Sequence, residues 1–169
     1  MQNFTMNRPQ AELELILLQA EADATSNADV YIWLRESGLP SEAAIRLTSL
    51  MEVTKQVGER VINIGKIVVV KLVEFARKHP NLAVGVAVGV VISLLVSSVP
   101  FLGPLLAPIA LILGVAVGAI VGHKMDKAKE TNVDPNLGIA QEIIEIARDF
   151  FRLLIETLQI SFSAEAGNV

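Results

Sequence analysis

The sequence predicts an all-α integral membrane protein, built as a helical hairpin with amphipathic cytoplasmic helices on both sides. Hydrophobic residues make up 52% of the 169 residues and charged residues only 19%, where about 25% is typical of soluble domains. Residues 81–122 carry no ionisable side chain at all. Basic residues flank this apolar block on both sides, and acidic segments lie further out.

These charge patterns divide the chain into four segments. Their net charges are −4, +3, zero and −3 in chain order, which sum to the overall net charge of −4. The predicted segments are an N-terminal helical cytoplasmic module (1–60), a basic juxtamembrane helix (61–80), a transmembrane hairpin (81–122) and a C-terminal amphipathic helix (123–169).

The N-terminal module reads as three helices. The first is Pro9–Ala24, which has apolar residues on one face and glutamates on the other. A polar loop follows, and the second helix stops at Gly38. Ser41 is a suitable N-cap for the third helix. The spacing of residues 28–50 is compatible with a DNA-binding helix-turn-helix, but the segment is net acidic, so a plain three-helix module is preferred.

The third helix is expected to continue without interruption into the basic segment. No proline occurs within residues 41–79, and a continuous helix there would be about 58 Å long. Gly58 and Gly65 are its weak points.

The apolar block is about twice as long as the roughly 20 residues that one membrane-spanning helix needs. Pro100, Gly103 and Pro104 end a helix and turn the chain, so two arms are expected, Leu82–Val99 and Leu105–Gly122. The alternatives are the buried core of a soluble helical bundle and a soluble form that inserts its hairpin later. The sequence does not distinguish a full crossing from a re-entrant hairpin.

The basic flanks predict the orientation of the hairpin. Lys and Arg stay on the cytoplasmic side of a membrane, so both termini are expected in the cytoplasm and the protein in the bacterial inner membrane. The predicted membrane-flanking residues are Lys66, Lys71, Arg77, Lys78, His79, His123, Lys124 and Lys127.

Small residues recur every four positions in both arms, which places them on one face of each helix. Such stripes permit close backbone approach between helices in lipid. They either close the hairpin on itself or pack against another subunit of a homo-oligomer. The predicted packing residues are Gly85, Gly89, Ser93, Ser97, Ala110, Gly114, Gly118 and Gly122.

The stretch from Gly114 to Gly122, Gly-Val-Ala-Val-Gly-Ala-Ile-Val-Gly, resembles glycine-zipper membrane segments. The run from Arg77 to Gly89 resembles the tail anchors of bacterial stress-induced inner-membrane proteins that associate with ribosomes, although ribosome binding is not carried over. In composition and layout the hairpin is also similar to the buried hairpin of pore-forming colicins. These resemblances imply a two-helix bacterial membrane hairpin.

After the hairpin, Asp134 and Pro135 form a helix-start signal, and an amphipathic helix is expected to about Phe162. Its apolar face needs a partner, either residues 61–76 or a neighbouring subunit. Its acidic polar face does not favour an anionic bilayer surface.

The chemistry of the sequence argues against an enzyme. There is no cysteine, no phosphate-binding loop and no HExxH motif, so neither a cofactor nor a metal is expected. The net negative charge argues against nucleic acid as a partner. The preferred function is an oligomeric protein that forms a pore or perturbs the membrane, as an effector, toxin or holin-like factor does. The alternative is a membrane-anchored scaffold that recruits a cytoplasmic protein partner.

Overall fold

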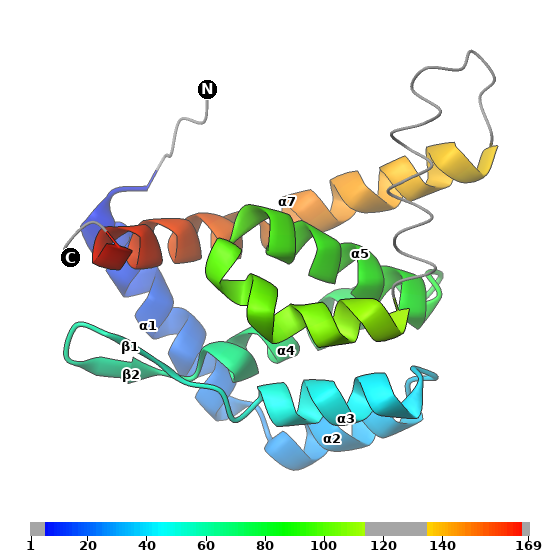
Figure 1. Cartoon of the computed structure of the whole chain (residues 1–169), viewed down its shortest axis with the longest axis horizontal. Coiled ribbons are helices and arrows are strands. Elements are labelled where there is room, and N and C mark those ends of the chain that lie inside the picture. The colour runs from blue at the N-terminus through cyan, green and yellow to red at the C-terminus, as the bar shows by residue number, and fades with distance from the viewer. Residues whose placement is uncertain (1–5, 114–134, 167–169) are drawn as a thin grey trace.

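The computed structural model describes residues 6–113 and 135–166, and it confirms a predominantly helical fold (Figure 1). Helix α7 runs along one side of the molecule and the α2–α3 pair lies on the other, with α5 between them in this view. The elements in chain order are α1 (Arg8–Ala24), α2 (Asn27–Glu36), α3 (Ser41–Leu50), β1 (Lys55–Val57), β2 (Arg60–Ile62), α4 (Ile64–Lys78), α5 (Val84–Ser98), η1 (Pro100–Leu102) and α7 (Pro135–Ala166).

The three N-terminal helices form where local signals place them. Asn7 caps α1 through a reciprocal capping box with Gln10. Ser26 caps α2, and its side chain accepts a hydrogen bond from the backbone N–H of Asp29. The chain leaves α2 through Gly38, whose φ of +89° suits glycine. The predicted three-helix module is therefore present, although the N-cap of α3 is Pro40 and not Ser41.

The predicted continuous helix over residues 41–79 is wrong. The chain leaves α3 at Leu50 and forms a two-stranded antiparallel ribbon before α4 begins at Ile64. Lys55 pairs with Ile62 and Val57 with Arg60, and Gly58 makes the turn with a φ of +62°. The β-branched residues of this short stretch favour extended backbone, and a glycine that supplies positive φ is a hairpin-turn signal.

Helices α4, α5 and α7 supply most of the central core. Two-thirds of the α4 residues are buried, and the apolar side of α7 packs on α1 and α5. Phe75 of α4 lies edge-on to Phe150 of α7, with ring centroids 5.3 Å apart, and 5.8 Å from the ring of Phe151. The C-terminal helix was expected to pack on residues 61–76, but its main partners are α1 and α5, and it reaches α4 through this aromatic cluster.

The structure contradicts the predicted membrane location. Among residues 6–113 and 135–166, no helix combines the length and the apolarity that crossing a bilayer requires. The arm expected at Leu82–Val99 is the 15-residue helix α5, about 22 Å long, whereas a hydrocarbon core is about 30 Å thick. The integral inner-membrane localisation, with both termini held in the cytoplasm by basic flanks, is therefore contradicted.

The physical reason lies in what covers the apolar side chains. Val91, Ile92 and Leu95 of α5 are fully buried against the chain's own helices. Apolar burial is favourable whether the surroundings are lipid or protein, so an uncharged sequence does not by itself specify which of the two surrounds it.

Candidate functional site

The candidate site is the apolar hairpin enclosed by the other helices, which we call the sheathed hairpin (residues 84–113). It consists of α5, the single turn η1 and a second helical arm over residues 103–113, which runs back from the turn (Figure 1). Helix α5 contacts α7 on one side and α4 on another. No residue of the sheathed hairpin carries an ionisable side chain.

The inner face of the sheathed hairpin is built from large aliphatic residues. In α5 they recur at helical spacing, which directs one stripe of side chains towards α4 and α7. The second arm continues this core with Leu106 and Ile109. Leu111 on the same arm is not part of this core, because 81% of its surface is exposed. The sheath therefore covers one face of the hairpin and leaves part of the second arm open.

The tip of the hairpin is fastened to the C-terminal part of α7. The Nε2 of Gln159 donates a hydrogen bond of 2.8 Å to the backbone carbonyl oxygen of Ser98. Beside it, the rings of Phe101 and Phe162 lie 4.4 Å apart. Lys55 of β1 caps this ring pair, with its Nζ 5.1 Å from the centroid of Phe101 and 5.4 Å from that of Phe162.

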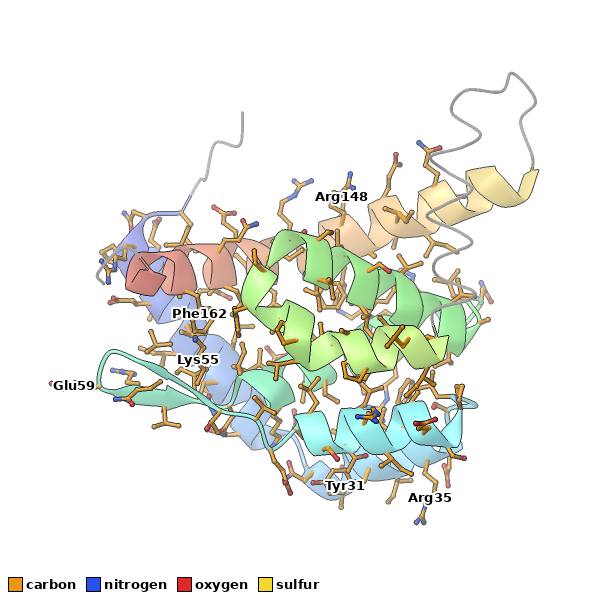
Figure 2. All side chains as sticks on the ribbon, viewed as in Figure 1. Tyr31, Arg35, Lys55, Glu59, Arg148 and Phe162 are labelled. Atoms are coloured by element: carbon orange, nitrogen blue, oxygen red, sulfur yellow. The ribbon has the colours of Figure 1, made fainter. Side chains whose placement is uncertain are left out.

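We call these five residues the tip latch: Lys55, Ser98, Phe101, Gln159 and Phe162. It joins three segments that are far apart in sequence, and Figure 2 shows Lys55 of the ribbon and Phe162 of α7 close together in the view. No sequence signal identified the tip latch, because single aromatic and lysine residues at long separation carry no periodicity.

The predicted small-residue stripe is not a close-packed helix contact along its whole length. Gly89 is buried, but Ser97 is exposed and Ser93 and Ala110 are only half-buried. At Gly85 a Cβ atom would meet nothing within 4 Å. At this end the stripe faces open space within one chain, and its role between subunits stays a prediction. Gly114, Gly118 and Gly122 lie outside the described residues.

Two of the predicted membrane-flanking lysines are engaged in ion pairs on α4. The Nζ of Lys71 lies 3.2 Å from a carboxylate oxygen of Glu21 on α1 and 3.3 Å from one of Glu74. Lys78 also pairs with Glu74, at 3.2 Å. Burial of Glu74 by itself raises its pKa, but Lys71 and Lys78 outweigh that effect and hold its pKa below the ordinary value of 4.5.

The other predicted flanking residues have different surroundings. His79 is half-buried and its ring lies 4.7 Å from that of Phe75, while Arg77 is exposed. Lys66 is half-buried on α4. His123, Lys124 and Lys127 lie outside the described residues.

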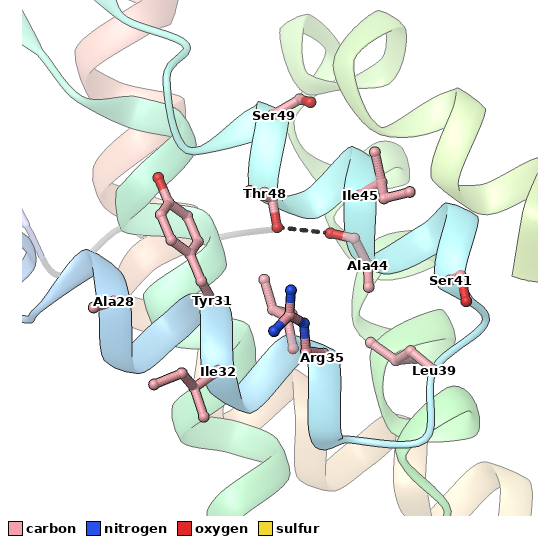
Figure 3. Close-up of a pocket in the computed structure, with 11 residues that line it drawn as sticks. Ala28, Tyr31, Ile32, Arg35, Leu39, Ser41, Ala44, Ile45, Thr48 and Ser49 are labelled. Atoms are coloured by element: carbon pink, nitrogen blue, oxygen red, sulfur yellow. Dashed lines mark hydrogen bonds between the residues drawn. The ribbon is translucent and has the colours of Figure 1, made fainter.

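A groove between α2 and α3 was not predicted from the sequence (Figure 3). It has a volume of about 730 Å³. Tyr31 and Arg35 enter it from α2, and Ile45 enters from α3, where 63% of its surface is exposed. The sequence does contain a signal for this groove, because Ile32 and Ile45 lie outside the buried faces of their helices.

The described residues hold no cluster of three or more His, Cys, Asp or Glu side chains that could bind a metal ion. Comparison of the chain with protein-family models, with curated proteins and with solved structures finds no match. The sheathed hairpin and its surroundings are therefore the features of this chain that bear on its function.

Proposed function

We propose that this protein perturbs membranes by releasing the sheathed hairpin at a bilayer surface. In this proposal the protein is not a resident spanning protein. The folded chain keeps the hairpin covered, and contact with a membrane exchanges the protein sheath for lipid. Membrane perturbation then depends on opening the tip latch and on several copies acting together.

The observation that carries the proposal is the absence of any ionisable side chain from the sheathed hairpin. An ordinary core helix needs one apolar face only, and α4 keeps lysines and a glutamate on its outer side. The outer side of the sheathed hairpin instead carries Leu111, Ala107 and Ser97. A hairpin without charge loses little when it leaves its protein sheath for lipid, because no charged group needs to be desolvated.

The test is dye leakage from liposomes with the full chain and with a latch that can be locked. The chain has no cysteine, so the double variant Ser98→Cys and Gln159→Cys carries one unique pair of thiol groups. A reducible bifunctional methanethiosulfonate linker should join the pair without requiring the short spacing of a direct disulfide. The wild-type chain should release dye, the linked chain should not, and reduction of the linker should restore release.

The matched control places the same linker between Arg148 and Arg152 of α7, two exposed positions one helical turn apart. This linker spans no boundary with the hairpin, so leakage should persist. Absence of leakage from the wild-type chain at any protein density would refute the proposal. Equal leakage from the latch-linked and unlinked chains would refute the role of the tip latch.

A second candidate function is an adaptor, and the α2–α3 groove favours it. Within the described part of the chain Arg35 makes no ion pair, and the groove around it is mostly apolar. The matching occupant is an amphipathic helix that carries one carboxylate. Helical peptides selected from a library on the wild-type chain should show this pattern and fail to bind Ile45→Glu. A library with the same enrichment on both chains would exclude the groove as a docking site.

A further inference from the structure

A second cavity lies between α1, the β-ribbon and the C-terminal part of α7. Its volume is about 410 Å³, within the range of small-molecule sites. Leu15 of α1, Val57 of β1 and Ile62 of β2 give it an apolar wall. The polar and charged residues of the lining are Arg8, Glu12, Glu59, Arg60 and Ser161.

Ser161 stands out because its hydroxyl group is buried without a partner. The residue is 6% exposed, and its Oγ makes no hydrogen bond. A helical Ser or Thr usually bonds the carbonyl oxygen one turn earlier, as Thr157 does with Leu153 at 2.7 Å. A buried hydroxyl that forgoes this bond carries a desolvation penalty, unless a group in the cavity supplies the missing hydrogen bond.

Two arginines and two glutamates line this cavity, and their arrangement favours an anion at Arg60. Within the described residues Arg60 makes no ion pair, and Arg8 reaches Glu12 only at 3.9 Å, with both side chains more than half exposed. Glu59 lies at the end of the ribbon turn and points away from the body of the molecule (Figure 2). Within the described residues the guanidinium group of Arg60 therefore remains without an ion pair and can hold one carboxylate or phosphate group.

We propose that this cavity binds a small amphiphile with a single anionic group. The carboxylate or phosphate lies at Arg60 and Arg8, the hydroxyl group of Ser161 donates a hydrogen bond to it, and a short apolar tail lies against Leu15 and Ile62. The anionic group belongs either to a free amphiphile or to a lipid headgroup. The proposal does not depend on hairpin release.

The experiment is isothermal titration of the full chain with four probes that share one eight-carbon tail. Octanoate and octyl phosphate should bind, whereas octyl glucoside and octylammonium should bind at least about tenfold more weakly, because they lack the charge-assisted bond. Equal affinity for the neutral and anionic probes, or no heat from any probe, would overturn the proposal.

Three variants separate a ligand role from a structural one. Arg60→Gln should lower the affinity for octyl phosphate by about tenfold, while Arg77→Gln, at an exposed arginine on α4 that lines neither cavity, should not change it. Ser161→Ala should weaken binding yet leave the melting temperature of the free protein unchanged or higher, because it removes a buried hydroxyl without a partner. Unchanged affinity in both Arg60→Gln and Ser161→Ala would overturn the assignment.

Vesicles of phosphatidylcholine and phosphatidylglycerol distinguish the two sources of the anion. If the protein sediments with these vesicles and octyl phosphate displaces it, the anion is a lipid headgroup. If octyl phosphate binds but does not compete with the vesicles, it is a free amphiphile. Both results support the site, and loss of octyl phosphate binding in Arg60→Gln is required in either case.

Discussion

Helices α4 and α5 have the same length, 15 residues, and both lie in the core, but they differ in what their outer faces carry. The outer side of α4 holds Lys71, Glu74 and Lys78, which tie the helix to itself and to α1. No charged residue occurs in α5. The first helix is fixed to the protein by directional polar contacts, whereas the second is retained mainly by the apolar packing of its neighbours.

This difference determines how the two helices respond to a change of surroundings. Removing α4 from the protein would break ion pairs and expose the aromatic cluster around Phe75. Moving α5 into lipid would exchange one apolar environment for another. The two helices therefore differ in the way that the proposed release of the hairpin requires, and each helix can be tested separately.

The largest effect is expected at the start of α4. A Cβ atom at Gly65 would collide with the backbone carbonyl oxygen of Leu50, and backbone cannot move aside as a side-chain end can. The backbone N–H of Gly65 also donates a hydrogen bond of 3.0 Å to the carbonyl oxygen of Val53. We expect Gly65→Ala to cost about 3 kcal/mol or more in the free energy of unfolding, measured by urea denaturation. A cost within about 0.5 kcal/mol would show that α4 is not fixed at this contact.

The helical class and the N-terminal module could be predicted because their signals are local. The caps Asn7 and Ser26, the turn glycine Gly38 and the amphipathic period of α7 each act within a few residues. The sequence did not predict the ribbon, because the absence of proline from residues 41–79 favours a continuous helix. The local signals for the ribbon are the turn glycine Gly58 and a few β-branched residues, and pairing between the two strands completes it.

The candidate site was predicted in composition but not in its surroundings. The predicted turn at Pro100 and Gly103 and the helical arms on either side of it are present as far as residue 113, and residues 114–122 of the second predicted arm lie outside the described residues. The sequence predicted that lipid surrounds these arms, whereas the protein buries them. Hydropathy does not distinguish a lipid neighbour from an apolar side chain such as Phe151 or Leu158. The tip latch depends on contacts between residues 46 or more positions apart, which periodicity does not encode.

A smaller effect is expected from the ion pairs of α4, and it depends on pH. Because the pKa of Glu74 is lowered in the folded protein, its contribution to stability is fully present above the unfolded value of about 4.5. This contribution is lost as the pH falls through the folded pKa. Glu74→Gln should therefore lower the free energy of unfolding at neutral pH by no more than about 1 kcal/mol, and the difference should vanish in acid.

Urea denaturation of both chains at a series of pH values measures this difference. Glu12→Gln is the matched control, because Glu12 makes only the 3.9 Å contact with Arg8 on an exposed surface. Its effect should be near zero at every pH. A Glu74→Gln difference that stays constant from neutral pH down to strong acid would contradict the role of Lys71 and Lys78 in holding the charge of this carboxyl group.

The smallest effect on stability is expected at Gly85 in α5, where an added side chain meets open space. Gly85→Leu should change the free energy of unfolding by no more than about 0.5 kcal/mol, in contrast to the loss expected at Gly65. Small residues permit close approach between helices, and a leucine in the stripe would prevent that approach between two copies. If the stripe joins subunits, which is one of its two predicted roles, Gly85→Leu should form smaller oligomers on vesicles and release less dye.

Gly103→Leu is the control for this prediction, since a Cβ there also meets nothing within 4 Å and the residue lies off the stripe. Chemical cross-linking on liposomes measures oligomer size for both variants, and the leakage assay measures activity. Equal oligomer size in the wild-type chain and Gly85→Leu would mean that this stripe makes no contact between copies at Gly85. Any oligomer would then be held together by another surface of the protein, because the same substitution adds bulk at Gly85.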